Sequence, residues 1–147
     1  MEKKPREIIV SGKEIYRLIP QRPPMVMVDA FYGFDGDKSL TGLTIEADNL
    51  FCQTGQLQES GIIEHIAQSA AVRVGYLYIQ RNEPIPLGFI GSIDQLTIHA
   101  LPAVDKVLAT EISIVQEVGD ITLIAVRVCS AGQLIAEGRM KIFLKKE

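Results

Sequence analysis

The hydrophobic and polar positions along the chain follow two periods, one typical of a helix and one typical of strands. Residues 61–80 repeat apolar side chains at a spacing of three and four, with Glu64, His65 and Arg73 in the opposite, polar half. This pattern predicts one long, mostly buried helix over Gly61–Gln80. A strip of small residues beside Glu64 would let another stretch of backbone lie close to the helix: Ala67, Ala71 and Gly75.

The segments on both sides of this helix have the pattern of strands. Apolar and β-branched residues dominate them, and the last segment alternates apolar with charged side chains. Turn signals at Gly36-Asp37, Gly119-Asp120 and Ala131-Gly132 separate neighbouring strands. The candidate strands are Met25–Phe34, Ser39–Glu46, Ile85–Ile93, Gln95–Leu101, Val107–Val118, Ile121–Cys129 and residues 134–144.

Two shorter features precede the long helix. Ser11 and Glu14 have the spacing of a capping box, and Pro20 would end a helix, so a short helix is predicted over about Gly12–Ile19. Residues 47–60 are polar and irregular, which predicts the longest loop of the chain. Loops of this length in a compact domain are usually functional or disordered.

One long helix and five or six antiparallel strands allow few arrangements. A strongly twisted sheet can curl around a single helix and bury it, and this arrangement is the hot-dog fold. We therefore expect an α+β hot-dog fold, with a long central helix wrapped by a curved antiparallel sheet. The length of 147 residues suits a single domain over residues 1–147.

The composition narrows the classes of function. The chain is 47% hydrophobic and has a net charge of −3, which argues against a nucleic-acid binder and against a polybasic membrane-surface protein. Its apolar segments are too short or too charged for a signal peptide or a membrane span. Cys52 and Cys129 make no disulfide framework, and the few histidines and cysteines lack the spacing of a metal site. We expect a cytoplasmic protein with no metal and no cofactor.

Glu64 is the leading candidate for chemistry. It lies in the expected first turn of the long helix, among apolar and small residues. The helix N-terminus favours its charged form and burial favours its neutral form, and this balance suits general acid–base catalysis. A charge that faces solvent is the alternative, and the residues alone leave both open.

The histidines and cysteines are weaker candidates. His65 follows Glu64 directly, and adjacent helical residues do not face each other, so a bonded pair of the two within one chain is not expected. A structural role in the core or at the surface is favoured for His65. His99 lies in a predicted strand, Cys52 lies in the long loop without a histidine partner, and Cys129 is expected in the core.

Several motifs, in this order, resemble the FabZ type of 3-hydroxyacyl-(acyl-carrier-protein) dehydratases. The sequence L-I-P-Q-R-P-P-M-V-M-V-D at residues 18–29 resembles the family's L-P-H-R-x-P-x-x-x-V-D opening, and G-I-I-E-H-I-A-Q at residues 61–68 resembles its central-helix pattern. Ile93-Asp94, the stretch from Pro102 to Asp105, and Gly132–Met140 match the later strands. In overall look the chain is most similar to small predicted dehydratases of polyene-pigment biosynthesis.

The resemblance implies a hot-dog dimer with acyl-binding sites at the interface between subunits. In the family, a histidine of a G-H-F-P loop in one subunit works with a helix carboxylate of the other, and that carboxylate matches Glu64. The loop histidine aligns with Gln56, and the histidine of the opening motif aligns with Gln21. The resemblance also implies substrate-binding positions at Gly55, Gly61 and Gln68.

Because glutamine cannot take a proton from carbon, three functions remain open. The first is a dehydratase subunit of fatty-acid or polyene-type lipid biosynthesis, which uses Glu64 alone or takes the histidine from another hot-dog protein. The second is a hot-dog thioesterase, and the third is a non-catalytic acyl-binding or scaffold subunit. The expected ligand is an acyl thioester on acyl-carrier protein or coenzyme A. The expected assembly is a homodimer, a higher oligomer or a hetero-oligomer with a second hot-dog protein.

Overall fold

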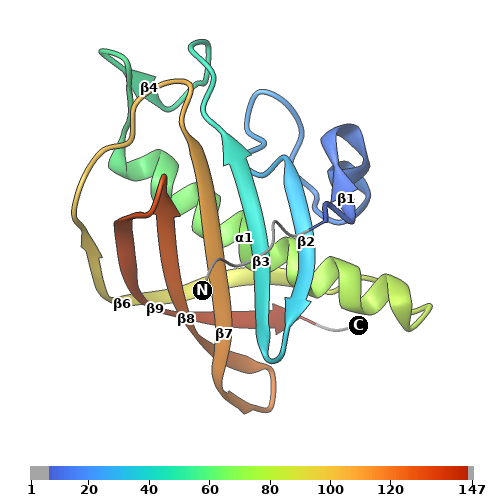
Figure 1. Cartoon of the computed structure of the whole chain (residues 1–147). Helices are drawn as coiled ribbons and strands as arrows, with labels where there is room; N and C mark the ends of the chain where they lie inside the picture. The colour runs from blue at the N-terminus through green and yellow to red at the C-terminus, as the bar shows by residue number, and fades with distance from the viewer. Residues whose placement is uncertain (1–6, 146–147) are drawn as a thin grey trace.

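The computed structural model describes residues 7–145, which form one long helix against a large, curved antiparallel sheet (Figure 1). Short elements come first in the chain, the long helix follows, and four long strands complete the sheet. The bounds are β1 Val10–Ser11, the 3₁₀ helix η1 Gly12–Arg17, β2 Ala30–Asp35, β3 Lys38–Thr44, β4 Cys52–Gln53, β5 Gln56–Leu57, α1 Glu59–Gln80, β6 Leu87–Ile98, β7 Val107–Val118, β8 Ile121–Ser130 and β9 Gln133–Lys145.

The large sheet has seven strands in the order β1-β2-β3-β7-β8-β9-β6, and neighbouring strands are antiparallel. This arrangement confirms the predicted α+β fold of one helix wrapped by a curved antiparallel sheet, with seven strands where five or six were expected. The predicted strands Ile85–Ile93 and Gln95–Leu101 are a single strand, β6. Irregular register near Gly91 and Gln95 bends β6 without ending it.

The N-terminal segment differs from the prediction in two ways. η1 is a 3₁₀ helix that ends at Arg17, and the side chain of Ser11 makes no capping hydrogen bond. The strand predicted from Met25 begins only at Ala30. The backbone N–H of Met27 and the carbonyl of Met25 are instead hydrogen-bonded to the side chain of Gln68 in α1, so these groups are not available for pairing with a strand.

The predicted loop over residues 47–60 contains regular structure of its own. β4 and β5 form a small separate hairpin, and α1 begins at Glu59, two residues earlier than predicted. The backbone N–H of Leu57 donates to the carbonyl of Pro102 at 2.9 Å, and that of Val104 donates to the carbonyl of Gly55 at 2.9 Å. The hairpin is therefore fixed against the segment that connects β6 to β7.

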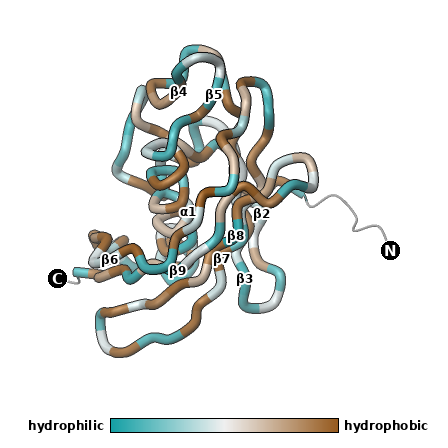
Figure 2. Tube along the Cα trace, turned by 90° about the vertical axis from the view of Figure 1, so that its left-hand side faces the viewer, coloured by the Kyte–Doolittle hydropathy of each residue, from teal (hydrophilic) through white to brown (hydrophobic). Residues whose placement is uncertain are grey.

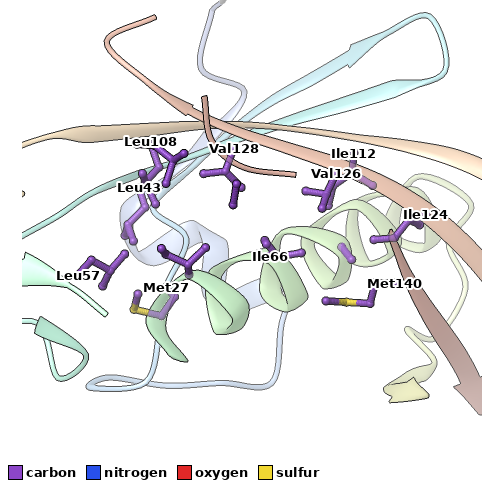
Figure 3. Packing of buried hydrophobic residues seen from close by; sticks show 14 of the residues in the cluster. Met27, Leu43, Leu57, Ile66, Leu108, Ile112, Ile124, Val126, Val128 and Met140 are labelled. Atoms are coloured by element: carbon purple, nitrogen blue, oxygen red, sulfur yellow. The ribbon is translucent and has the colours of Figure 1, made fainter. Parts of the chain in front are cut away.

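Helix α1 is continuous from Glu59 to Gln80, as predicted, and lies along one face of the sheet (Figure 1). Figure 3 shows Ile66 of α1, with Ile124 and Val126 of β8, pointing into the space between helix and sheet. In the part of the chain that the structure describes, no helix is long and apolar enough to cross a membrane.

Two polar side chains of α1, His65 and Ser69, are buried against the sheet. Thr41 and Thr110 pair across β3 and β7, and both side chains face the helix. The hydroxyl of Thr41 donates to Ser69 Oγ at 2.8 Å, and Thr110 Oγ1 lies 2.7 Å from Nε2 of His65. Buried polar groups are retained in a core when they are hydrogen-bonded, and these pairs explain why these two polar positions of α1 do not face solvent.

The strip of small residues brings another backbone close to α1 at Gly75. A Cβ atom at this position would lie 2.2 Å from the carbonyl oxygen of Leu18. Ala67 and Ala71 are only partly buried and line a cavity. The strip therefore seats the N-terminal segment at one end and leaves room for a site at the other.

Candidate active site

A cavity of about 590 Å³ lies beside α1. Its walls come from η1 and the segment that follows it, from one face of α1, and from the start of β6 and the end of β9. Apolar cavities with a few polar groups are typical sites for small molecules. On α1 the wall places one carboxylate among small apolar side chains: Glu64, Ala67, Ala70, Ala71 and Val74.

Glu64 is oriented by a hydrogen bond within its own helix. Nε2 of Gln68, one turn later, donates to Oε1 of Glu64 at 2.8 Å. The sequence predicted Glu64 in the first turn of the helix. Because α1 begins at Glu59, Glu64 lies in the second turn instead. The field of the helix N-terminus falls off beyond the first turn, so the contact with Gln68 takes on the larger part in holding the carboxylate.

Gln68 is fully buried and uses its whole amide group. Besides its bond to Glu64, Nε2 donates to the carbonyl of Met25 at 2.7 Å, and Oε1 accepts from the N–H of Met27 at 2.6 Å. These bonds join the extended segment 25–27 to α1. Gln68 is not part of the cavity wall in a single chain, so the geometry assigns it to positioning Glu64, and its predicted contact with substrate stays a prediction.

The other predicted site residues lie at the β4–β5 hairpin and at the start of α1. Gly55 forms the hairpin turn with φ of +75°, and an added Cβ at Gly61 would lie 2.6 Å from the side chain of Leu57. Gln56 is exposed, and its Nε2 donates to a backbone carbonyl at 3.4 Å. Within one chain, the cavity of Glu64 is lined by none of Gly55, Gln56 and Gly61. The predicted approach of Gln56 to Glu64 of a neighbouring chain stays a prediction.

Neither histidine of the sequence serves Glu64 within the chain. His65 is fully buried, with Nδ1 at 2.6 Å from the carbonyl oxygen of Met27 and Nε2 hydrogen-bonded to Thr110. Burial lowers the pKa of His65 to about 4, so it is neutral at neutral pH. Nε2 of His99 lies 2.9 Å from Oε2 of Glu137 at the surface. His65 is therefore a structural residue, as expected.

The two cysteines are both unpaired. Burial raises the pKa of Cys52, which lowers the fraction of its nucleophilic thiolate form. Cys129 is half-buried and belongs to neither core cluster, which corrects its predicted place in the core. Among residues 7–145, no group of three or more histidine, cysteine, aspartate or glutamate side chains could hold a metal ion.

Three polar residues at the cavity were not among the predicted site residues. Gln21 lines the cavity, and its Oε1 is buried without a hydrogen-bond partner in the described structure. Arg17 and Arg22 add two exposed cations to the same wall. Nη1 of Arg22 is held by the backbone carbonyls of Ile19 and Gln21 at 2.9 and 2.7 Å. Gln21 and Arg22 belong to the opening motif at residues 18–29, which is the signal that points to them, whereas Arg17 lies just before it.

Similar solved structures share this arrangement of helix and sheet. The dehydratase heterocomplex ApeI:P from Xenorhabdus doucetiae contains a chain with a TM-score of 0.82 and 18% identity, over 90% of this chain and 91% of that one. A hypothetical thioesterase with coenzyme A from Streptococcus pneumoniae TIGR4 has a TM-score of 0.63 and 10% identity, over 80% and 85% of the two chains. AziG of S. sahachiroi has a TM-score of 0.63 and 18% identity, over 82% and 92%. At these identities the likeness establishes the hot-dog fold. No curated protein matches the chain.

The fold and the cavity define a hot-dog protein with one carboxylate in the wall of a largely apolar pocket. Residues 13–147 match the family model ApeP-like, described as ApeP dehydratase. The match extends over most of the sequence, so the chain belongs to the ApeP-like dehydratase family. This membership confirms the resemblance to small hot-dog dehydratases, and it makes the protein a dehydratase-like hot-dog subunit of the hydro-lyase class.

Proposed function

We propose that this chain is one subunit of a dehydratase that removes water from 3-hydroxyacyl thioesters in polyene-type or fatty-acid biosynthesis. Family membership supports the type of reaction, and the resemblance of the sequence motifs supports the substrate class. The observation that carries the proposal is Glu64, a carboxylate of fixed orientation in the wall of an apolar cavity. Gly55, Gln56, Gly61 and Gln68 complete the proposed site, directly or by holding its parts.

The elimination needs two proton-transfer groups. One removes a proton from C2 of the acyl chain, and the other protonates the hydroxyl that leaves from C3, so that a C2–C3 double bond and water are formed. Glu64 supplies one of these groups. His65 and His99 are engaged elsewhere, and glutamine occupies the two positions at which the resembling family has histidine. The second group is therefore proposed to come from a partner hot-dog subunit.

The exposed strand β6 is the proposed seat of that partner. It lies at one edge of the sheet, with β1 at the other, and pairs with β9 alone among the described strands (Figure 2). Leu87, Phe89 and Ile90 are 51%, 50% and 44% exposed, and a long apolar edge strand favours pairing with another chain. The same three residues line the cavity of Glu64, so a strand docked on β6 would also cover the site. The heterocomplex reported for the X. doucetiae protein supports a hetero-oligomer.

The carrier of the substrate is proposed to enter beside η1. Arg17 and Arg22 offer cations for the phosphate that acyl-carrier protein and coenzyme A share in their phosphopantetheine arm. Two unpaired cysteines suit a reducing, cytoplasmic setting.

The type of reaction is tested with two substrates and two readouts. A 3-hydroxyacyl thioester of acyl-carrier protein is offered to the chain in complex with the hot-dog protein that copurifies with it, and loss of water is followed by mass. A plain acyl thioester is offered in parallel, and release of free thiol is followed. The proposal expects water loss without thiol release. Thiol release from the plain acyl thioester would favour a thioesterase, and no reaction with either substrate would favour a scaffold subunit.

A further inference from the structure

The cavity of Glu64 adjoins a second, smaller cavity farther along α1. The second cavity has a volume of about 180 Å³ and shares Ala70, Val74, Ile142 and Leu144 with the first. Its wall then continues to Arg73, Leu77 and Arg81 on α1. Glu64 and Arg73 are nine residues apart in the helix, which is about 13.5 Å along its axis. The two cavities together therefore follow the helix from an acid to a cation.

The far cavity differs from the first in its chemistry. Nε of Arg73 is buried and has no hydrogen-bond partner among residues 7–145. Its guanidinium lies 6.0 Å from the centre of the Phe34 ring, which holds one face of the group. Glu117, from the end of β7, lies close enough to act on the charge of Arg73 but forms no ion pair with it in the described structure. The guanidinium of Arg73 is thus a cation in the wall of this cavity that no carboxylate of residues 7–145 neutralises by direct contact.

Removing water from a charged group without giving it a new partner is unfavourable. A purely hydrocarbon ligand would do this to the terminal nitrogens of Arg73. A ligand oxygen would replace the water there, and the planar guanidinium matches a carboxylate or another oxygen acceptor. The wall between the two cavities carries small or apolar side chains on α1, which suits the hydrocarbon part of such a ligand.

We propose that the acyl chain of the substrate extends from Glu64 past Ala70 and Val74, and that Arg73 binds an oxygen at its far end. The preferred substrates are then acyl thioesters whose ω-terminus carries a hydrogen-bond acceptor, and not those that end in a methyl group. This inference rests on the proposed function, because it takes the thioester to be held at Glu64. It adds a selection for the end of the chain that is farthest from the reacting carbons.

Binding of unreactive probes tests this inference separately from the reaction. The probes are pantetheine thioethers of alkyl chains, which have no hydroxyl group to lose as water and no thioester to cleave. They are prepared in two series of matched chain lengths, ending in methyl or in carboxylate. Affinity is measured by calorimetry on the protein in the assembly in which it purifies. Chains long enough to span from Glu64 to Arg73 should bind about tenfold tighter with a carboxylate end. Shorter carboxylate probes should bind more weakly than their methyl partners, because the charge then lies among apolar side chains.

An Arg73→Gln variant identifies the residue responsible. It should lose the preference for long carboxylate probes and keep the affinity for methyl probes. Arg127→Gln, which removes an exposed cation from β8 outside both cavities, should keep the preference. Equal or tighter binding of long methyl probes by the unmodified protein would overturn the inference and leave the acyl site in place. Failure of both series to bind would overturn the acyl site itself.

Discussion

The carboxylate of Glu64 is oriented by Gln68, a side chain that does not itself reach the cavity. Gln68 bonds to Glu64 four residues away and to Met25 and Met27, which precede it by more than 40 residues. The sequence predicts Glu64 as the chemical group because only local features are needed: a helix, a carboxylate and small neighbours. The distant partners of Gln68 depend on the tertiary fold, so its positioning role could not be predicted.

Other residues of the site were hidden from the sequence for the same reason. Arg17 and Arg73 belong to segments that meet the cavities only after folding, and neither stands in one of the motifs of the sequence. The structural role of His65 was predictable, since adjacent helical positions cannot face each other. Its partners, Met27 and Thr110, were not, because both are far away in the chain.

The buried His65 gives stability a predictable pH dependence. Its pKa is lowered to about 4 in the folded state, so at pH values between about 6.5 and 4 the unfolded chain binds more protons than the folded one. The contribution of neutral His65 is complete above pH 6.5 and is lost as the pH falls toward 4, by about 3 kcal/mol in total. Urea unfolding at pH 7, 6, 5 and 4.5 should follow this loss.

A His65→Gln variant provides the comparison for this experiment. Glutamine can still hydrogen-bond to Thr110 but does not titrate, so the variant should be less stable at pH 7 and should vary less with pH between 6.5 and 4.5. Parallel pH curves for the two proteins would show that His65 does not cause the loss.

The long elements follow the sequence pattern, and the short ones do not. α1 and β7, β8 and β9 have many periodic positions, so local pattern and tertiary packing agree on their limits. η1 and the strand predicted from Met25 are short and have few periodic positions, so single tertiary contacts determine where these elements begin and end. The two strands predicted over Ile85–Ile93 and Gln95–Leu101 are likewise joined into β6 because β6 stays paired with β9 on both sides of the irregular positions.

The N-terminal segment packs closely on α1 because Gly75 has no side chain. In a Gly75→Ala variant the new methyl group meets the backbone of Leu18 at 2.2 Å, and backbone cannot move aside easily. We expect a loss of about 1–3 kcal/mol in the free energy of unfolding. Chemical denaturation measures this loss.

Ala67→Leu is the matched control on the same helix. Ala67 is half-buried, lines the cavity of Glu64 and belongs to neither core cluster, so a larger side chain has space there and should change the unfolding free energy much less. It should instead weaken the binding of acyl probes, because it fills part of the cavity. Equal stability of the Gly75→Ala variant and the unmodified protein would contradict the close packing of α1 on the N-terminal segment.

At the scale of the whole molecule, the exposed edge strand β6 is the surface on which assembly is proposed. A Phe89→Lys substitution places a charge in the middle of its apolar surface, which is 50% exposed at that residue. Charged residues on edge strands oppose pairing, so the variant should lose its partner or its dimer in light-scattering measurements at micromolar concentration. Val118→Lys, at the exposed end of β7, should leave the assembly unchanged. Loss of assembly in the Val118 variant alone would place the interface elsewhere.

The most direct test of the account is the dehydration rate of the chain alone and in complex with its hot-dog partner, measured on a 3-hydroxyacyl thioester. The chain alone should be nearly inactive, and the complex should be active. Glu64→Gln in the complex should lower the rate by about 10²–10⁴, the usual contribution of a general acid–base group. Glu59→Gln, an exposed position of the same helix, should leave the rate unchanged. Full activity of the Glu64→Gln complex with preserved assembly, or full activity of the chain alone, would contradict the proposed site.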